Sequence, residues 1–306
     1  MASTVSTSEF RLQWIPTEAI LRHELRSLLA SWLVRFWFVA TILLTLLILT
    51  ANWHESPTAL MLQAMLFPYL VFPWFLVVMV LGISPVTGSR LDALSDSILS
   101  RPLTRYEYLL AAWAARVLVV LGVYTAVMLP GGVLIASATR NVPEDPVTAY
   151  GLVLTLILAG LVQTLLVTLG FLMGTLLRRP LLAAVVLVFT WLPINLVLST
   201  FSLEQFSPFT LYQAVPTLAR MERSSEEAED ASRSAQRDAE ALAAQAEQFM
   251  RLLSGQPAAA APPQRSGFLE PRAFEELSVV KILLGYGIPT VIALGLSLWI
   301  FQRRDL

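Results

Sequence analysis

Long apolar runs recur along the chain between short polar connections. Each run holds about 20 residues or more, which is the length that an α-helix needs to cross roughly 30 Å of hydrocarbon. The runs are continuous rather than alternating, so they favour helices over the strands of a barrel. The pattern predicts an all-α polytopic membrane protein with six transmembrane helices, at residues 33–52, 60–83, 109–137, 148–177, 181–201 and 279–301.

Proline and glycine interrupt three of these runs. They are Pro68 and Pro73 in the second run, Pro130 with the two glycines after it in the third, and Pro193 in the fifth. Proline removes one helical hydrogen bond, and membrane helices tolerate this where neighbouring helices satisfy the freed backbone groups. We expect kinks or broken helices at these positions.

Arginine gathers at alternate connections. These residues are Arg11, Arg22 and Arg26 before the first run, Arg90, Arg101 and Arg105 after the second, Arg178 and Arg179 after the fourth, and Arg303 and Arg304 after the sixth. Because cytoplasmic loops carry the excess of basic residues, both termini are predicted to be cytoplasmic. The 202–278 connection is then extracytoplasmic, and the chain is expected to be a multi-pass protein of the plasma (bacterial inner) membrane.

The cytoplasmic N-terminus, residues 1–32, contains an amphipathic pattern whose start is expected near Pro16 and Thr17. Its apolar positions are Ile20, Leu21, Leu25, Leu28, Leu29 and Trp32, and its polar positions include Arg22, Glu24 and Arg26. A basic amphipathic helix beside a span is expected to lie in the membrane interface. We interpret it as an elbow helix along the cytoplasmic surface, and the alternative is an ordinary helix that extends the first span.

The extracytoplasmic region at residues 202–278 begins with an aromatic, proline-bearing stretch suited to short helices at the outer interface. Residues 217–254 are rich in Ala, Glu and Arg, which predicts a long helix. Its heptad positions are Met221, Ala228, Ala235, Leu242 and Phe249. This helix is expected to project outward or to pack on a partner, and the alternative is a solvated helix with many charge pairs. A Pro/Ala-rich linker follows it, and residues 279–306 form the last span and a cytoplasmic tail.

The 306-residue sequence lacks the residue patterns of the common catalytic sites. It has no cysteine, and its sole lysine, Lys281, follows "LSVV", so the chain cannot hold a phosphate-binding P-loop. It contains neither H-E-x-x-H nor G-x-S-x-G. We therefore expect no enzyme activity, no metal site and no cofactor in this chain, and its net charge of -1 gives no reason to expect a nucleic-acid partner.

Few polar residues lie inside the apolar runs: Gln63, Arg116, Gln163 and Asn195. Arg116, Gln163 and Asn195 are candidates for a transport pathway or for structural anchors. Arg116 lies about two turns inside the third run, so it could snorkel to the interface as an anchor or line a cavity. The acidic residues fall in loops and at span ends, which argues against a proton-coupled carrier and towards energy supplied from outside the chain.

The connection at residues 84–108 is longer than two adjacent spans require, and its apolar residues recur at helical spacing. Ser89 and Asp92 form a capping box, which begins a helix. Leu91, Leu94 and Ile98 then fall on one face. The pattern predicts a short amphipathic helix on the cytoplasmic side.

A second capping box closes this connection. Pro102 stops the short helix because the residue before a proline avoids the α region. Thr104 and Glu107 then begin the third span. The result is a short helix, a proline turn and a membrane helix entered at a fixed angle. A plain amphipathic loop helix is the alternative.

The stretch "DALSDSILSRPLTRYEYL" resembles the loop between spans two and three of ABC-2 type transporter permeases. In that family a leucine-rich short helix is followed by Ser, a variable residue, Pro, an aliphatic residue, Ser or Thr, and Arg. The matching residues are Leu94, Ile98, Leu99, Ser100, Arg101, Pro102, Leu103, Thr104 and Arg105. The N-terminal amphipathic helix, "FSPF" at residues 206–209, the ending "FQRRDL" and the six-span topology also agree.

The sequence departs from the family pattern at three places. Residues 87–90 read "TGSR" where Glu-Gly-Thr is frequent, and Arg116 is the nearest substitute for a lysine common early in span three. The insertion at residues 217–267 is not general in the family. These departures leave the substrate open.

The resemblance implies a coupling helix that docks on a separate cytoplasmic ABC ATPase dimer, which carries ATP and Mg. The implied coupling residues are Arg90, Leu91, Asp92, Leu94, Asp96, Ile98, Arg101, Pro102, Thr104, Arg105 and Glu107. It also implies a second permease chain, identical or paralogous, surrounded by membrane lipids, and we expect an exporter. The alternative is a non-transporting mechanotransmission or assembly subunit that acts on an extracytoplasmic partner through the 217–254 helix.

Overall fold

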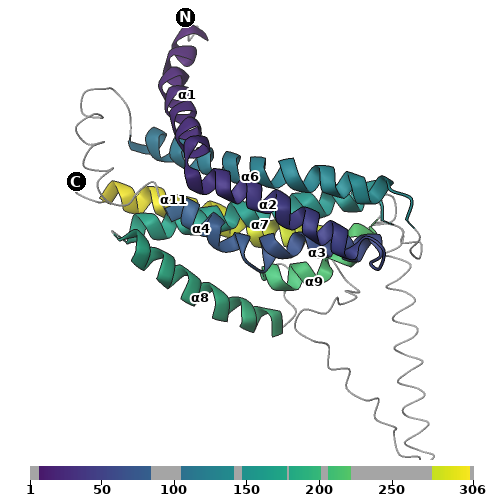
Figure 1. Ribbon diagram of the computed structural model, residues 1–306. Helices are drawn as coiled ribbons and strands as arrows, with labels where there is room; N and C mark the ends of the chain where they lie inside the picture. The colour runs from purple at the N-terminus through teal and green to yellow at the C-terminus, as the bar shows by residue number, and fades with distance from the viewer. Residues whose placement is uncertain are drawn as a thin grey trace, which may run out of the picture.

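The computed structural model of the protein describes residues 7–83, 105–140, 147–177, 179–200, 206–221 and 278–303, and helices are its only regular elements there (Figure 1). The helices are α1 (Thr7–Ala30), α2 (Trp32–Asn52), α3 (Thr58–Leu70), α4 (Trp74–Ile83), α6 (Arg105–Ser137), α7 (Ala149–Leu176), α8 (Pro180–Thr200), α9 (Pro208–Ala219) and α11 (Val279–Arg303). The predicted all-α class is therefore confirmed.

Five stretches of the described chain are helical, long and apolar enough to cross a membrane: Trp32–Asn52, Thr58–Ile83, Tyr106–Ser137, Ala149–Leu176 and Val279–Arg303. They coincide with five of the six predicted runs, which confirms a multi-pass membrane protein. The remaining predicted run is the helix α8, whose apolar stretch Pro180–Asn195 is shorter. α8 contacts α4, α7 and α9, and Figure 1 shows it running at an angle to the other long helices.

The second span is broken between α3 and α4, as its prolines predict. Residues 71–73 leave the helix, and the Phe72–Pro73 peptide is cis. By contrast, α6 and α8 continue through Pro130 and Pro193, so of the two expected outcomes, a kink or a break, the helices are not broken there. A proline removes only one backbone hydrogen bond, and packing can hold the helix together across that position.

The helix α7 occupies the centre of the bundle and packs against α4, α6, α8, α9 and α11. Gly170 and Gly174 form a G-x-x-x-G pair that lets the backbones of α7 and α4 touch. A Cβ at Gly170 would lie 2.3 Å from the carbonyl oxygen of Met79, and one at Gly174 would lie 2.6 Å from that of Ile83. Only glycine fits at this contact.

The short helix α9 begins where the aromatic stretch after residue 202 predicts a short helix. Ser207 caps it, Pro208 follows at its first turn, and nearly all of its residues are buried against α3, α7 and α8. It ends at Ala219, so residues 217–219, where the long helix is predicted to begin, belong to α9. The rest of that predicted helix, beyond Met221, lies outside the described residues.

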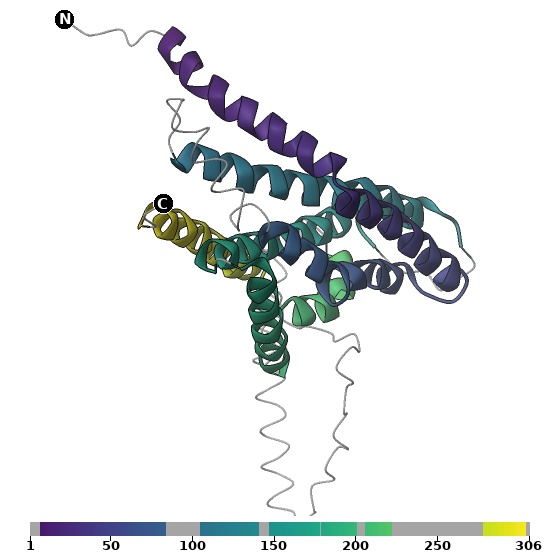
Figure 2. The same cartoon turned by 60° about the vertical axis from the view of Figure 1, so that its left-hand side comes forward.

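The helix α1 begins at Thr7, well before the start predicted at Pro16, which instead lies inside the helix. A separate helix, α2, follows after Ser31, whose backbone is extended and whose side chain caps α2. Leu21, Leu25 and Leu28 pack into the core, and α1 runs beside the first half of α6 (Figure 2). Part of the apolar stripe of α1 therefore packs against other helices of the protein.

Candidate coupling site at the start of α6

The helix α6 begins directly after the connection in which the coupling residues are predicted. It starts at Arg105, where the capping box of Thr104 and Glu107 predicts a helix start, and Glu107 lies half-buried in its first turn. An acidic residue there favours the helix dipole. The other predicted coupling residues lie outside the described part of the chain: Arg90, Leu91, Asp92, Leu94, Asp96, Ile98, Arg101, Pro102 and Thr104.

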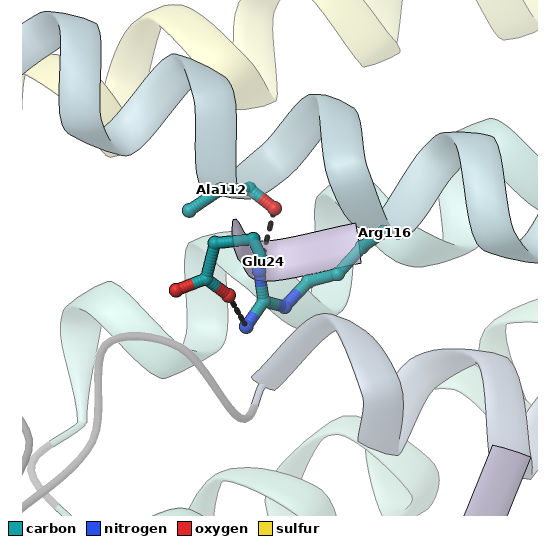
Figure 3. A network of polar contacts seen from close by, with 3 residues as sticks. All are labelled: Glu24, Ala112 and Arg116. Atoms are coloured by element: carbon teal, nitrogen blue, oxygen red, sulfur yellow. Dashed lines mark hydrogen bonds and ion pairs between the residues drawn. The ribbon is translucent and has the colours of Figure 1, made fainter. Parts of the chain in front are cut away.

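A buried ion pair joins α6 to α1 near this start. The Arg116 guanidinium on α6 lies 3.5 Å from the Glu24 carboxylate on α1, measured from Nη2 to Oε2 (Figure 3). The side chain of Arg116 is 0% exposed and that of Glu24 is 10% exposed. Nη1 of Arg116 also donates to the carbonyl oxygen of Ala112, 2.5 Å away. The guanidinium therefore points into the α1–α6 contact and does not snorkel outward.

Glu24 is a functional candidate that the sequence reasoning missed, because it was assigned to the polar side of the amphipathic helix. The signal was present: Glu24 lies three residues after Leu21 and four before Leu28, and both leucines pack into or against the core. Residues at these spacings share a helix face. A buried arginine within an apolar run needs a partner, and an acid on the apolar stripe of the preceding helix is a natural one.

The second polar candidate, Gln163 on α7, donates through Nε2 to the carbonyl oxygen of Tyr69, 2.9 Å away. Tyr69 lies in the last turn of α3, and the residue four positions later is Pro73, which has no N–H to offer. Gln163 therefore satisfies a carbonyl that proline leaves without a helical donor. The Tyr69 ring meets that of Tyr124 on α6 edge to face, with centroids 5.0 Å apart.

Gln63 on α3 makes the same kind of contact elsewhere in the bundle. Its Nε2 donates to the carbonyl oxygen of Tyr212 on α9, 3.0 Å away, and the residue four positions after Tyr212 is Pro216. Burial raises the pKa of the Tyr212 phenol above its usual value. Tyr212 is therefore neutral at physiological pH, and the contact involves no charged group.

The third candidate, Asn195 on α8, is buried and bonds within its own helix and to the next connection. Its Nδ2 donates to the carbonyl oxygen of Trp191, 2.9 Å away. The backbone carbonyl oxygen of Asn195 accepts a hydrogen bond from the Ser207 hydroxyl at 3.4 Å. Arg116, Gln163 and Asn195 thus bond to three different parts of the fold, and these contacts do not bring them into one site.

Within the described ranges, no three His, Asp or Glu side chains come together in a group that could hold a metal ion. The chemistry that these residues offer is electrostatic and structural: one buried ion pair and several amide-to-carbonyl bonds.

Comparison with known proteins adds the family. No curated protein matches the sequence significantly. Residues 95–306 match the family model described as ABC-2 family transporter protein, which covers more than half of the chain. ABC-2 permeases are the membrane subunits of ABC transporters, work with an ABC ATPase subunit and are not themselves catalytic. This chain belongs to the ABC-2 transporter family and is a membrane permease subunit.

Proposed function

We propose that this permease is the membrane-spanning half of an exporter, driven by ATP that a separate cytoplasmic ATPase dimer hydrolyses. Energy enters through the 89–107 segment, which docks on the ATPase as a coupling helix. A second permease chain, identical or paralogous, completes the pathway in the plasma (bacterial inner) membrane. Both termini are cytoplasmic. ATP and Mg bind the ATPase subunits, and this chain holds neither.

The buried Arg116–Glu24 pair is the observation that carries the proposal. The helix α6 begins at Arg105, within the 89–107 segment. A push on that segment therefore acts first on the start of α6. The ion pair ties α1 to α6 about three turns into the helix. Displacement of α6 therefore carries α1 with it, and two helices respond to one contact with the ATPase.

The proposal includes six spans, with α8 as the fifth. Its 21 residues extend about 31 Å at 1.5 Å per residue, which is enough to cross the hydrocarbon. Asn195 donates through Nδ2 to its own helix, so its amide nitrogen is satisfied at a membrane position. Figure 1 supports the alternation in part, because the C-terminal end of α11 and the start of α6 lie at the same end of the bundle.

The test is a double substitution in the coupling segment, Leu94→Asp with Asp96→Arg. It places a charge on the apolar face and reverses the charge beside it, so docking on the ATPase should fail. We expect membrane insertion to persist while copurification of the ATPase, or the activity of the copurified ATPase, falls at least tenfold. Insertion is measured by membrane fractionation, and ATP hydrolysis by phosphate release.

The matched control is Glu55→Arg, which reverses an exposed charge in the turn between α2 and α3 at the opposite end of the bundle. It should leave both copurification and ATP hydrolysis unchanged. A fully active ATPase that copurifies with the Leu94→Asp/Asp96→Arg variant would refute the assignment of the coupling segment.

A further inference from the structure

The corner where α1 meets α2 carries an aromatic surface that the packing of the helices leaves uncovered. Trp32 is 76% exposed and Phe36 is 56% exposed, and their rings stack with centroids 5.2 Å apart. Leu29 and Leu33 are exposed beside them. The apolar stripe of α1 therefore divides, with one part packed against α6 and the other part facing outward at this corner.

One arginine lies on the same helix as the aromatic pair, and a second lies on the last turns of α1. Nε of Arg35 donates to the carbonyl oxygen of Leu29 at 3.1 Å, which holds the guanidinium over the last turn of α1. Arg26 lies one turn before Leu29 and is exposed. A guanidinium has five N–H donors, and the bond to Leu29 uses one of those on Arg35.

The corner has an excess of positive charge. Among the described residues, no carboxylate lies within ion-pair distance of Arg26 or Arg35, whereas Arg22 on the same helix pairs with Glu18 at 3.3 Å. Arginine recognises phosphate through its planar set of donors. Arg26 and Arg35 are therefore two guanidinium groups of this region that no described carboxylate neutralises.

The depth of the corner identifies the source of that anion. The 21 residues of α2 span about 31 Å, so the whole helix is needed to cross the hydrocarbon. Trp32, its first residue, therefore lies at the boundary of the hydrocarbon layer. Tryptophan and arginine at that boundary favour the headgroup layer. A free phosphate would contact the arginines, but it would leave the stacked rings of Trp32 and Phe36 exposed.

We propose that the α1–α2 corner binds an anionic phospholipid. Arg26 and Arg35 hold the headgroup phosphate, and Trp32 and Phe36 lie against the glycerol and the upper acyl chains. Glu24 is two residues before Arg26, so the bound lipid also secures the segment of α1 that carries the ion pair to α6. This site does not depend on the ATPase or on the transported substrate.

The test uses the full chain in phosphatidylcholine bilayers with brominated phosphatidylglycerol or, in parallel, brominated phosphatidylcholine. Bromine quenches nearby tryptophans, and the signal of Trp32 is the difference between each protein and its Trp32→Phe counterpart. We expect Trp32 to be quenched at a several-fold lower mole fraction of the anionic lipid. Arg26→Gln/Arg35→Gln should raise that fraction at least about fivefold, since one arginine contributes about that factor at an anionic surface.

The matched control is Arg179→Gln/Arg303→Gln, which removes two exposed arginines away from the corner; the Arg303 guanidinium lies 4.1 Å from the centre of the Trp299 ring. It should keep the preference for the anionic lipid. If the corner variant fails to insert, Arg26→Gln alone carries the test, because it leaves the Arg35–Leu29 bond intact and should still raise the fraction about fivefold.

Three results would overturn the proposal. Equal quenching of wild-type Trp32 by the two brominated lipids would mean that the corner does not select a charged headgroup. Equal loss of preference in the corner and control variants would indicate general attraction to the surface. Displacement of phosphatidylglycerol by inorganic phosphate, but not by sodium chloride of equal ionic strength, would assign the corner to a free anion.

Discussion

Two buried glutamines each bond to a backbone carbonyl that a proline leaves without its helical donor. Gln63 serves Tyr212, four residues before Pro216, and Gln163 serves Tyr69, four residues before Pro73. In hydrocarbon an unsatisfied carbonyl is unfavourable because no water replaces the missing donor. These amides therefore allow proline inside a packed membrane protein.

The contact between Gln63 and α9 can be tested by a double-mutant cycle. Gln63→Met keeps the length of the side chain but removes its amide, and should lower the free energy of unfolding by about 1–2 kcal/mol. Pro216→Ala restores an N–H inside α9 that can reach Tyr212. In that background the effect of Gln63→Met should shrink by about half or more.

The measurement is thermal unfolding in detergent for the four proteins of the cycle. An equal loss of stability from Gln63→Met in both backgrounds would show that the amide stabilises the protein in some way unrelated to the carbonyl of Tyr212.

The sequence identifies these residues as unusual, but it does not predict which glutamine bonds to which carbonyl. Gln63 and Gln163 are visible as polar positions within apolar runs, and each proline identifies the carbonyl four residues earlier. The partners, however, are 149 residues apart for Gln63 and Tyr212 and 94 apart for Gln163 and Tyr69. Only the packing of distant helices decides which amide meets which carbonyl.

At the scale of elements, α6 is held near both of its ends. The Arg116–Glu24 pair ties its first half to α1. Beyond its last residue, Arg140 donates to the Thr58 hydroxyl at 2.6 Å and to the carbonyl oxygen of Ser56 at 3.1 Å. A helix fixed at two levels transmits a displacement along its axis instead of bending away.

The ion pair between α1 and α6 should be strongly coupled. Glu24→Gln or Arg116→Gln alone removes the opposite charge from a buried ion pair, and should lower the free energy of unfolding by about 3–5 kcal/mol. The double variant should be less destabilised than the sum of the two single variants, by at least about 1 kcal/mol.

Glu18 and Arg22 provide the control, since they form an exposed ion pair on the same helix. The equivalent cycle with Glu18→Gln and Arg22→Gln should give a coupling of about 0.5 kcal/mol or less. Thermal unfolding measures both cycles. If the two coupling energies agree, the Arg116–Glu24 pair does not hold α1 on α6.

Element positions follow from the sequence most closely where an apolar run meets a polar connection. The first run is predicted to begin at residue 33 and α2 begins at Trp32; the last is predicted from residue 279 and α11 begins at Val279. The start predicted for α1 is wrong because a proline such as Pro16 is typical of the first turn of a helix. The helix instead begins at Thr7 and continues through Pro16.

For the whole molecule, the faces that meet lipid could not be assigned from hydropathy. Exposed apolar side chains line α2, α8 and α11, whereas α7 is buried on nearly every side. Lipid and protein neighbours are equally apolar, so the composition of a span does not distinguish them. The glycine pair on α7 is a better guide, because small residues mark where two helices touch.

The topology of the whole chain can be tested by cysteine labelling, because the sequence contains no cysteine. Single cysteines at Glu55, Arg179 and Phe206 report on the α2–α3 turn and on the two ends of α8. With six spans and a cytoplasmic N-terminus, Glu55→Cys and Phe206→Cys should react with a membrane-impermeant maleimide on intact cells. Arg179→Cys should react only after permeabilisation, since a charged reagent does not cross the bilayer. If Arg179→Cys and Phe206→Cys react from the same side, α8 does not cross the membrane and the chain has five spans.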